Sequence, residues 1–180
     1  YSASAGGSIN FGGGSIRGPF PMTLGADNLM SFTSVTLGAP TTLSATGGTA
    51  LLSGNITGSA TNTLTNTGLV RINGGDGSWA GAFTNNSGAT WTEDGAGWTR
   101  AMNTNTFTNA GTLNFPGTVA WSFNSGVNTF TNTGSVVKSS GGTMQMTGYA
   151  RTNSGAMNVV ANGGTLQFNS SSFASNAGAT

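Results

Sequence analysis

The sequence predicts an all-β protein built as a parallel β-solenoid, in which short strands coil around one axis and each coil lies on the one before it. Three observations predict this fold: a phrase that recurs about every 20–23 residues, apolar residues that alternate beside it, and a composition suited to strands and turns. Regular periods in this range are typical of solenoid repeats.

The recurring phrase is Asn-x-Gly, and its successive copies are 20, 23, 23, 21 and 23 residues apart. The copies begin at Asn66, Asn86, Asn109, Asn132, Asn153 and Asn176. An apolar–Thr–Asn lead precedes them, and the extra Asn85 before Asn86 predicts a bulge there. At the corners of coils, Asn and Gly tolerate left-handed backbone conformations, and stacked Asn side chains can hydrogen-bond to one another as a ladder.

Apolar residues alternate after each phrase, and a second short strand follows a Gly-Thr turn. Val136 begins the alternation, but Lys138 breaks it. Because alternate side chains of a strand point to opposite faces, stacking should place Phe107 over Phe130 and Leu113 over Val136 and then Met157. The side chains expected to be buried are Leu64, Phe83, Phe107, Phe130, Leu113, Phe115, Trp121, Phe123, Met144, Met146, Leu166 and Phe168.

Composition excludes several classes of protein. Of the 180 residues only 5% are charged, with a single Glu and a single Lys, which disfavours helices, while 10 Phe and 4 Trp at a net charge of +1 disfavour disorder. The absence of Cys removes disulfides and thiolate metal sites, and scattered basic residues give no nucleic-acid footprint. Without His and with few carboxylates, we expect no enzyme, cofactor or metal site, and no apolar run is long enough for a membrane helix.

The alternative fold is a β-sandwich or jelly roll, whose strands also recur with turns between them. A sandwich does not require residues 109–123 and 132–146 to be copies of one another, whereas a solenoid does. Residues 1–22 are Gly-rich and contain Pro19 and Pro21, so we expect an irregular N-terminal arm or cap there. Residues 23–180 are expected to form a single solenoid domain.

The Asn-x-Gly and Gly-Thr phrases, with Leu-Ser-Gly-Asn-Ile-Thr-Gly at 52–58, resemble the β-solenoid repeats of bacterial autotransporter passengers and filamentous-haemagglutinin-type adhesins. The resemblance covers roughly residues 40–180. It implies a right-handed parallel β-helix, an extracellular or bacterial cell-surface location, and a role in surface display, adhesion or fibre formation. The family has no universal catalytic residues to carry over.

The least regular coil, between residues 73 and 105, is where a ligand site is expected. Its candidate residues are Trp79, Trp91, Trp98, Glu93 and Asp94. The tryptophan rings could stack on a sugar, as in an adhesin that binds a surface glycan, or they could fill the interior of the coil. Both interpretations are left open by the sequence.

The principal functional hypothesis is a structural subunit whose copies join end to end into a fibre, with the chain itself as its partner. Residues proposed for this self-assembly lie in the first and last coils: Tyr1, Ile9, Phe11, Phe173 and Asn176. Residues 1–22 would then complete a neighbour's coil or cap their own, unless the chain is an excerpt of a longer solenoid. Ice binding is a further alternative, but we find no Thr-x-Thr phrase repeated at one coil position, since Thr61-Asn62-Thr63 and Thr104-Asn105-Thr106 are isolated cases.

Overall fold

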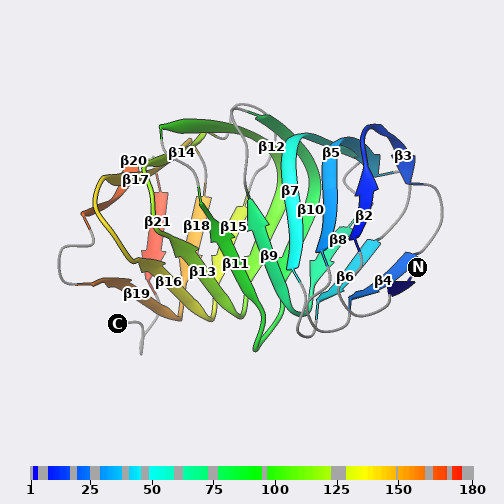
Figure 1. Cartoon of the computed structure of the whole chain (residues 1–180). Helices are drawn as coiled ribbons and strands as arrows, with labels where there is room; N and C mark the ends of the chain where they lie inside the picture. Colours follow the sequence, from blue (N-terminus) through cyan, green and yellow to red (C-terminus); the bar gives the residue numbers. More distant parts are fainter. Residues whose placement is uncertain are drawn as a thin grey trace.

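The computed structural model describes residues 2–3, 8–16, 20–24, 29–37, 41–45, 49–58, 63–72, 77–94, 97–122, 129–148, 150–160, 164–169 and 172–175. Within these ranges every regular element is a β-strand, and all the pairings between strands are parallel. The strands follow one another along a single axis, with the two ends of the chain at opposite ends of the stack (Figure 1). The predicted parallel β-solenoid is confirmed, and the antiparallel sandwich is wrong.

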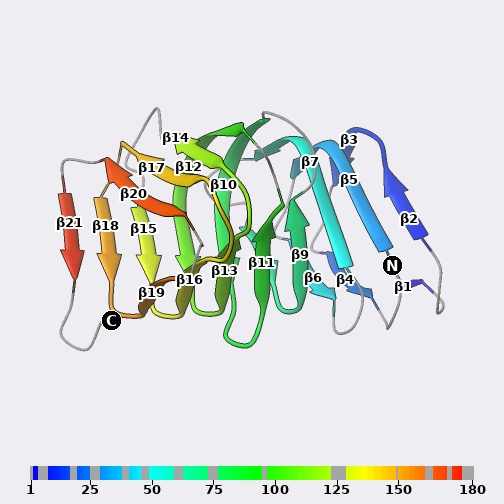
Figure 2. The ribbon, with the colours of Figure 1, turned by 60° about the vertical axis from the view of Figure 1, so that its left-hand side comes forward.

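The coil has three faces, each a stack of parallel strands. Face 1 contains β1 (Ser2–Ala3), β4 (Phe20–Leu24), β6 (Thr41–Ala45), β8 (Thr63–Asn66), the second half of β10 (Gly77–Asn85), the second half of β12 (Trp98–Asn109), β15 (Thr129–Asn132), β18 (Ala150–Asn153) and β21 (Ser172–Ser175). Figure 2 shows β15, β18 and β21 side by side and pointing the same way.

The other two faces are built in the same manner. Face 2 contains β2 (Ser8–Phe11), the first halves of β5 (Leu29–Leu37) and β7 (Thr49–Gly58), β9 (Leu69–Ile72), β11 (Thr90–Glu93), β13 (Thr112–Phe115), β16 (Ser135–Lys138) and β19 (Ala156–Val159). Face 3 contains β3 (Gly14–Ile16), the second halves of β5 and β7, the first halves of β10 and β12, β14 (Val119–Ser122), β17 (Thr143–Thr147) and β20 (Thr165–Asn169).

The four long strands each turn a corner between two faces. The register of β10 against β12 shifts between Gly81 and Ala82, and Gly81 has a φ of 124° that suits glycine. In β5 the shift falls at Ser34, the one described non-glycine residue with a positive φ. Bulges of this kind bend a strand and increase its local twist, so these positions mark where the chain changes face.

The bulge predicted beside Asn86 is wrong. Asn85, not Asn86, pairs with Asn66 in the coil before and with Asn109 in the coil after. The extra residues lie after Asn85, in a turn that leads to Thr90 at the start of β11. The strand thus stays regular, and the insertion is taken up by a longer turn.

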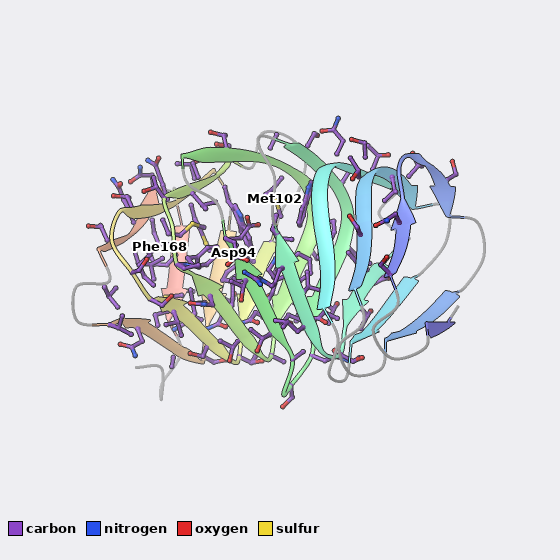
Figure 3. All side chains as sticks on the ribbon, in the orientation of Figure 1. Asp94, Met102 and Phe168 are labelled. Carbon is purple, nitrogen blue, oxygen red and sulfur yellow. The ribbon has the colours of Figure 1, made fainter. Side chains whose placement is uncertain are left out.

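The interior holds columns of apolar side chains, one from each coil. Phe107 lies in register with Phe130 and Leu113 with Val136, which in turn pairs with Met157, as predicted. The following predicted core residues are buried: Leu64, Phe83, Phe107, Phe130, Leu113, Phe115, Trp121, Met144 and Met146. Leu166 and Phe168 are partly buried against the core (Figure 3 labels Phe168), and Phe123 lies outside the described residues.

The described part of residues 1–22 is more regular than expected. Its strands β1, β2, β3 and β4 pair in parallel with β4, β5, β5 and β6, respectively. Even Pro21 lies within β4, in register with Thr42. The described strands of this segment therefore belong to the same stack, and its role as an arm or a cap stays a prediction.

A ladder of asparagine side chains, which we call the Asn ladder, runs along the corner between face 1 and face 2. The Nδ2 atom of each residue donates to the Oδ1 atom of the next, at 2.9, 2.8, 2.7 and 2.7 Å. Its members are Asn66, Asn85, Asn109, Asn132 and Asn153, all of them buried. Spare Nδ2 protons bond to backbone carbonyls, such as that of Ser135 for Asn109 at 3.0 Å, so the buried amides are satisfied within the stack.

Gly88 of the second Asn-x-Gly phrase has the predicted left-handed backbone, with a φ of 79°, but the glycines of three later phrases are needed for another reason. Gly111, Gly134 and Gly155 have no positive φ. Instead, a Cβ atom at any of them would lie far inside van der Waals contact with a backbone oxygen of the coil before. Backbone hydrogen bonds also cross this corner, for example from Ser135 N to Gly111 O at 2.8 Å. Glycine is thus required because successive turns approach each other so closely.

Candidate functional site

The candidate ligand residues of the irregular coil do not form one exposed site. The indoles of Trp79 and Trp91 are completely buried and meet edge to face, with ring centroids 5.7 Å apart. Glu93 is also completely buried, and its Oε1 atom accepts a hydrogen bond from Trp121 Nε1 at 3.3 Å. A sugar-stacking residue must present a ring face to solvent, so Trp79 and Trp91 belong to the core.

Asp94 and Trp98 have different surroundings. Asp94 lies at the end of β11 (Figure 3) and pairs with Arg71 of the preceding coil, with 2.5 Å between Oδ2 and Nε. The Arg71 side chain is half exposed, so this pair contributes little to stability. Trp98 starts β12 in register with Val119, and its side chain lies outside the described residues.

The residues proposed for self-assembly are placed only in part. Ile9 and Phe11 lie in β2, in register with Met30 and Phe32. Phe173 lies in β21, in register with Arg151. The side chains of these three, and the whole of Tyr1 and Asn176, fall outside the described residues. In β21 it is Ser175, the residue before Asn176, that pairs with Asn153.

Lys138 does not interrupt the core as the sequence suggested. Its side chain is completely buried on face 2, in the column between Phe115 and Val159. The Nζ atom donates to three backbone carbonyls, Phe115 O at 3.1 Å, Gly141 O at 3.0 Å and Ser140 O. Three acceptors match the three protons of an ammonium group, so this lysine closes the turn that leads from face 2 to face 3.

Burial of Lys138 gives the stability of the protein a defined pH dependence. Desolvation lowers the pKa of Lys138 below 10.5, so the folded chain loses this proton at a lower pH than the unfolded chain does. Between the lowered pKa and 10.5 the unfolded state binds more protons, and the free energy of unfolding should therefore rise with pH. Urea denaturation across this range, on the chain and on Lys138→Met, measures the effect as their difference. A difference that does not change with pH would contradict the prediction.

The outward side chains of face 1 form two rows of threonine that sequence reasoning missed. The first row contains Thr65, Thr84, Thr108, Thr131 and Thr152, in register from β8 to β18. The second row contains Thr63, Ala82, Thr106 and Thr129. The phrase Thr-x-Thr thus recurs at one coil position in β8, β12 and β15, and the expectation that it does not is wrong. In the sequence, each of these phrases consists of the apolar and Thr residues of the lead together with the Thr that precedes them.

Two shallow hollows lie on the outer side of the described part of face 3. One, of about 410 Å³, is lined by Asn55, Gly77, Ser78, Thr99 and Ala101. The other, of about 140 Å³, adjoins it at Thr99 and reaches Gln145. Both are open to solvent and lined by small side chains, and neither has a charged or aromatic side chain in its lining.

Among the described residues, no group of three or more acidic side chains could hold a metal ion. Nor does that part of the chain contain a helix of the length and apolarity needed to span a membrane.

Comparison of the chain with protein-family models, with curated proteins and with solved structures finds no match. The fold, the Asn ladder and the buried Lys138 are therefore known from the structure of this chain alone. On that evidence this protein is a parallel β-solenoid whose candidate ligand aromatics Trp79 and Trp91 belong to its core and whose face 1 carries threonines in register.

Proposed function

We propose that this chain is a non-catalytic extracellular structural protein, a rod whose layers hold a fixed spacing and whose copies join end to end. The Asn ladder is the observation that carries the proposal. Its four hydrogen bonds run in one direction and join five successive coils at nearly constant length. Hydrogen bonds in such chains polarise one another, so the ladder stiffens the rod along its axis.

The layers of this rod are nearly interchangeable as neighbours. Asn109 bonds to Asn132 as Asn85 bonds to Asn109, and Phe130 packs on Phe107 much as Phe107 packs on Phe83, at 5.9 and 6.2 Å between ring centroids. A layer of one copy can therefore continue the stack of another. Such a contact is heterologous and does not close on itself, so it generates an open fibre. The likeness of the repeat phrases to those of surface-displayed solenoids supports this proposal from the sequence side.

An adhesin that binds glycan is the other hypothesis from the sequence, and the structure removes much of its support. Trp79, Trp91 and Glu93 are enclosed in the core and cannot contact a ligand there. Substitution of these three residues would change the free energy of unfolding and would not remove a contact with a ligand. Within the described residues, the hollows on face 3 are one place where a glycan could bind.

Electron microscopy of the purified chain tests the fibre proposal. We expect filaments of one uniform width whose length increases with protein concentration, because each added copy contributes the same interface. A matched variant that lacks residues 1–22 separates two modes of assembly. Loss of filaments would support donation of β1, β2, β3 and the beginning of β4 to a neighbour, whereas unchanged filaments would show that other layers make the junction. A full-length chain that stays monomeric at high concentration would contradict end-to-end assembly.

A further inference from the structure

We propose that face 1 binds ice, with the two threonine rows as the contact surface. This inference goes beyond the structural role, because it concerns the side of the rod and not the junctions between copies. The surface extends over β8, β10, β12, β15 and β18 and consists of the outward residues of these strands.

The first step of the argument is spacing. Parallel strands lie about 4.8 Å apart, and alternate residues of one strand lie about 6.6 Å apart, so the two rows form a rectangular array. The register is unbroken within face 1, where Thr65, Thr84, Thr108, Thr131 and Thr152 follow one another without a shift. An array of this kind repeats in two dimensions with periods of the same order as the oxygen repeats of an ice surface.

The second step is chemistry. Each threonine offers a methyl group, which water surrounds as a cage, and a hydroxyl group, which both donates and accepts hydrogen bonds. No described outward side chain of face 1 is charged. Charged partners such as nucleic acids or anionic membranes need basic residues on the protein surface. An uncharged array of hydroxyl groups therefore favours an uncharged binding partner, such as an ice surface.

The third step is rigidity. The buried Asn ladder begins one residue beyond the first row, since Asn109 follows Thr108 and Asn132 follows Thr131. The inward neighbours of the rows are the stacked rings of Phe83, Phe107 and Phe130. Hydrogen bonds thus hold one edge of the array and packed rings support it from beneath, so little conformational entropy is lost when it contacts an ordered surface.

The other two faces lack this regularity in their described parts. Face 2 presents Arg71, Thr92, Asn114, Val137 and Asn158 at successive outward positions, which mixes charged, hydroxyl, amide and aliphatic groups. Face 3 is hollowed beside Thr99. Face 1 is therefore the face that suits a flat lattice.

The test compares two lysine substitutions in the same coil. Thr108→Lys projects a charge from the centre of the first row, whereas Thr112→Lys places the same charge on face 2 at a threonine that is also half-buried. The measurements are thermal hysteresis, inhibition of ice recrystallisation, and the partition of the chain into a growing ice hemisphere, with circular dichroism to confirm that both variants fold. We expect the chain to enter ice, Thr108→Lys to lose activity several-fold, and Thr112→Lys to keep it.

A gain of activity gives an independent readout. Ala82 leaves a gap in the second row between Thr63 and Thr106. Ala82→Thr should fill it and raise ice recrystallisation inhibition, which a purely structural role for this face does not predict.

Three outcomes would overturn the proposal. Exclusion of the chain from growing ice is the first, and equal losses in both lysine variants are the second. The third is a chain that shows no ice activity but binds microcrystalline cellulose or chitin, or dimerises in ultracentrifugation. If Thr108→Lys abolished that binding or dimerisation, face 1 would serve another partner. None of these outcomes depends on whether filaments form, so failure here and failure of the fibre proposal are distinguishable.

Discussion

Replacement of Asn109 by alanine is expected to lower the free energy of unfolding by about 3 kcal/mol or more. Asn109 is the middle member of the Asn ladder and takes part in two of its bonds, to Asn85 at 2.8 Å and to Asn132 at 2.7 Å. It also donates to Ser135 O. The substitution leaves one Nδ2 proton of Asn85 and the Oδ1 atom of Asn132 buried without these partners, and each unsatisfied buried group costs about 1–3 kcal/mol.

Urea denaturation followed by circular dichroism measures this loss. Asn158→Ala is the matched control, because Asn158 is an exposed asparagine on face 2. Surface substitutions of this kind usually stay within about 0.5 kcal/mol. Equal stabilities of the two variants would mean that the ladder contributes nothing to the stack.

Replacement of Gly134 by alanine should be as damaging, for a steric reason. The added Cβ atom would overlap the carbonyl oxygen of Gly111 in the coil before. That oxygen accepts a hydrogen bond from Ser135 N at 2.8 Å and belongs to the backbone, so it cannot turn aside as a side chain can. Separation of the two coils at this corner would also strain the Asn109–Asn132 bond. We expect a loss of about 3 kcal/mol, at the upper end of the usual range for overpacking.

Gly141→Ala provides the control for this prediction. Gly141 lies in the turn after Lys138, and a Cβ atom there would have no heavy atom within 4 Å. It has no positive φ, so alanine is not strained by the backbone. Thermal unfolding should show a clear fall in Tm for Gly134→Ala and a nearly unchanged Tm for Gly141→Ala. Similar Tm values for both variants would contradict the close approach of successive turns.

The repeat in the sequence carries most of the fold. Phe107 and Phe130, and likewise Leu113 and Val136, occupy equal places in successive copies, and equal places become neighbours in a parallel stack. This inference needs no knowledge of long-range contacts, because each coil contacts only the next. It explains why the interior columns could be predicted residue by residue.

The errors arise where a local pattern has two interpretations. Asn85 and Asn86 fit the repeat phrase equally well, and only the inward alternation with Phe83 selects Asn85. Lys138 is a charged residue of a kind that a core normally excludes. Here three backbone carbonyls accept hydrogen bonds from its ammonium group, which makes its burial possible.

The candidate site could be predicted least of all. Tryptophans in an irregular coil are equally consistent with a ligand platform and with a core, and Trp79 and Trp91 turn out to fill the interior. The threonine rows lie beside the apolar and Asn positions of the lead, which are the positions that predict the core. Thr106 and Thr108 flank Phe107, so their regularity follows from the same repeat.

Cysteine cross-linking tests the parallel, in-register stack most directly, since the chain has no cysteine of its own. Thr108 and Thr131 are register partners on the outside of face 1, where neighbouring strands lie about 4.8 Å apart and a disulfide can form. The paired substitutions Thr108→Cys and Thr131→Cys should therefore oxidise to an intramolecular disulfide. The control pair Thr108→Cys and Thr129→Cys uses the same two strands but is out of register by one outward position. Rapid oxidation of the first pair with little of the second is the predicted result; equal or reversed rates would contradict the register on which both the Asn ladder and the threonine rows depend.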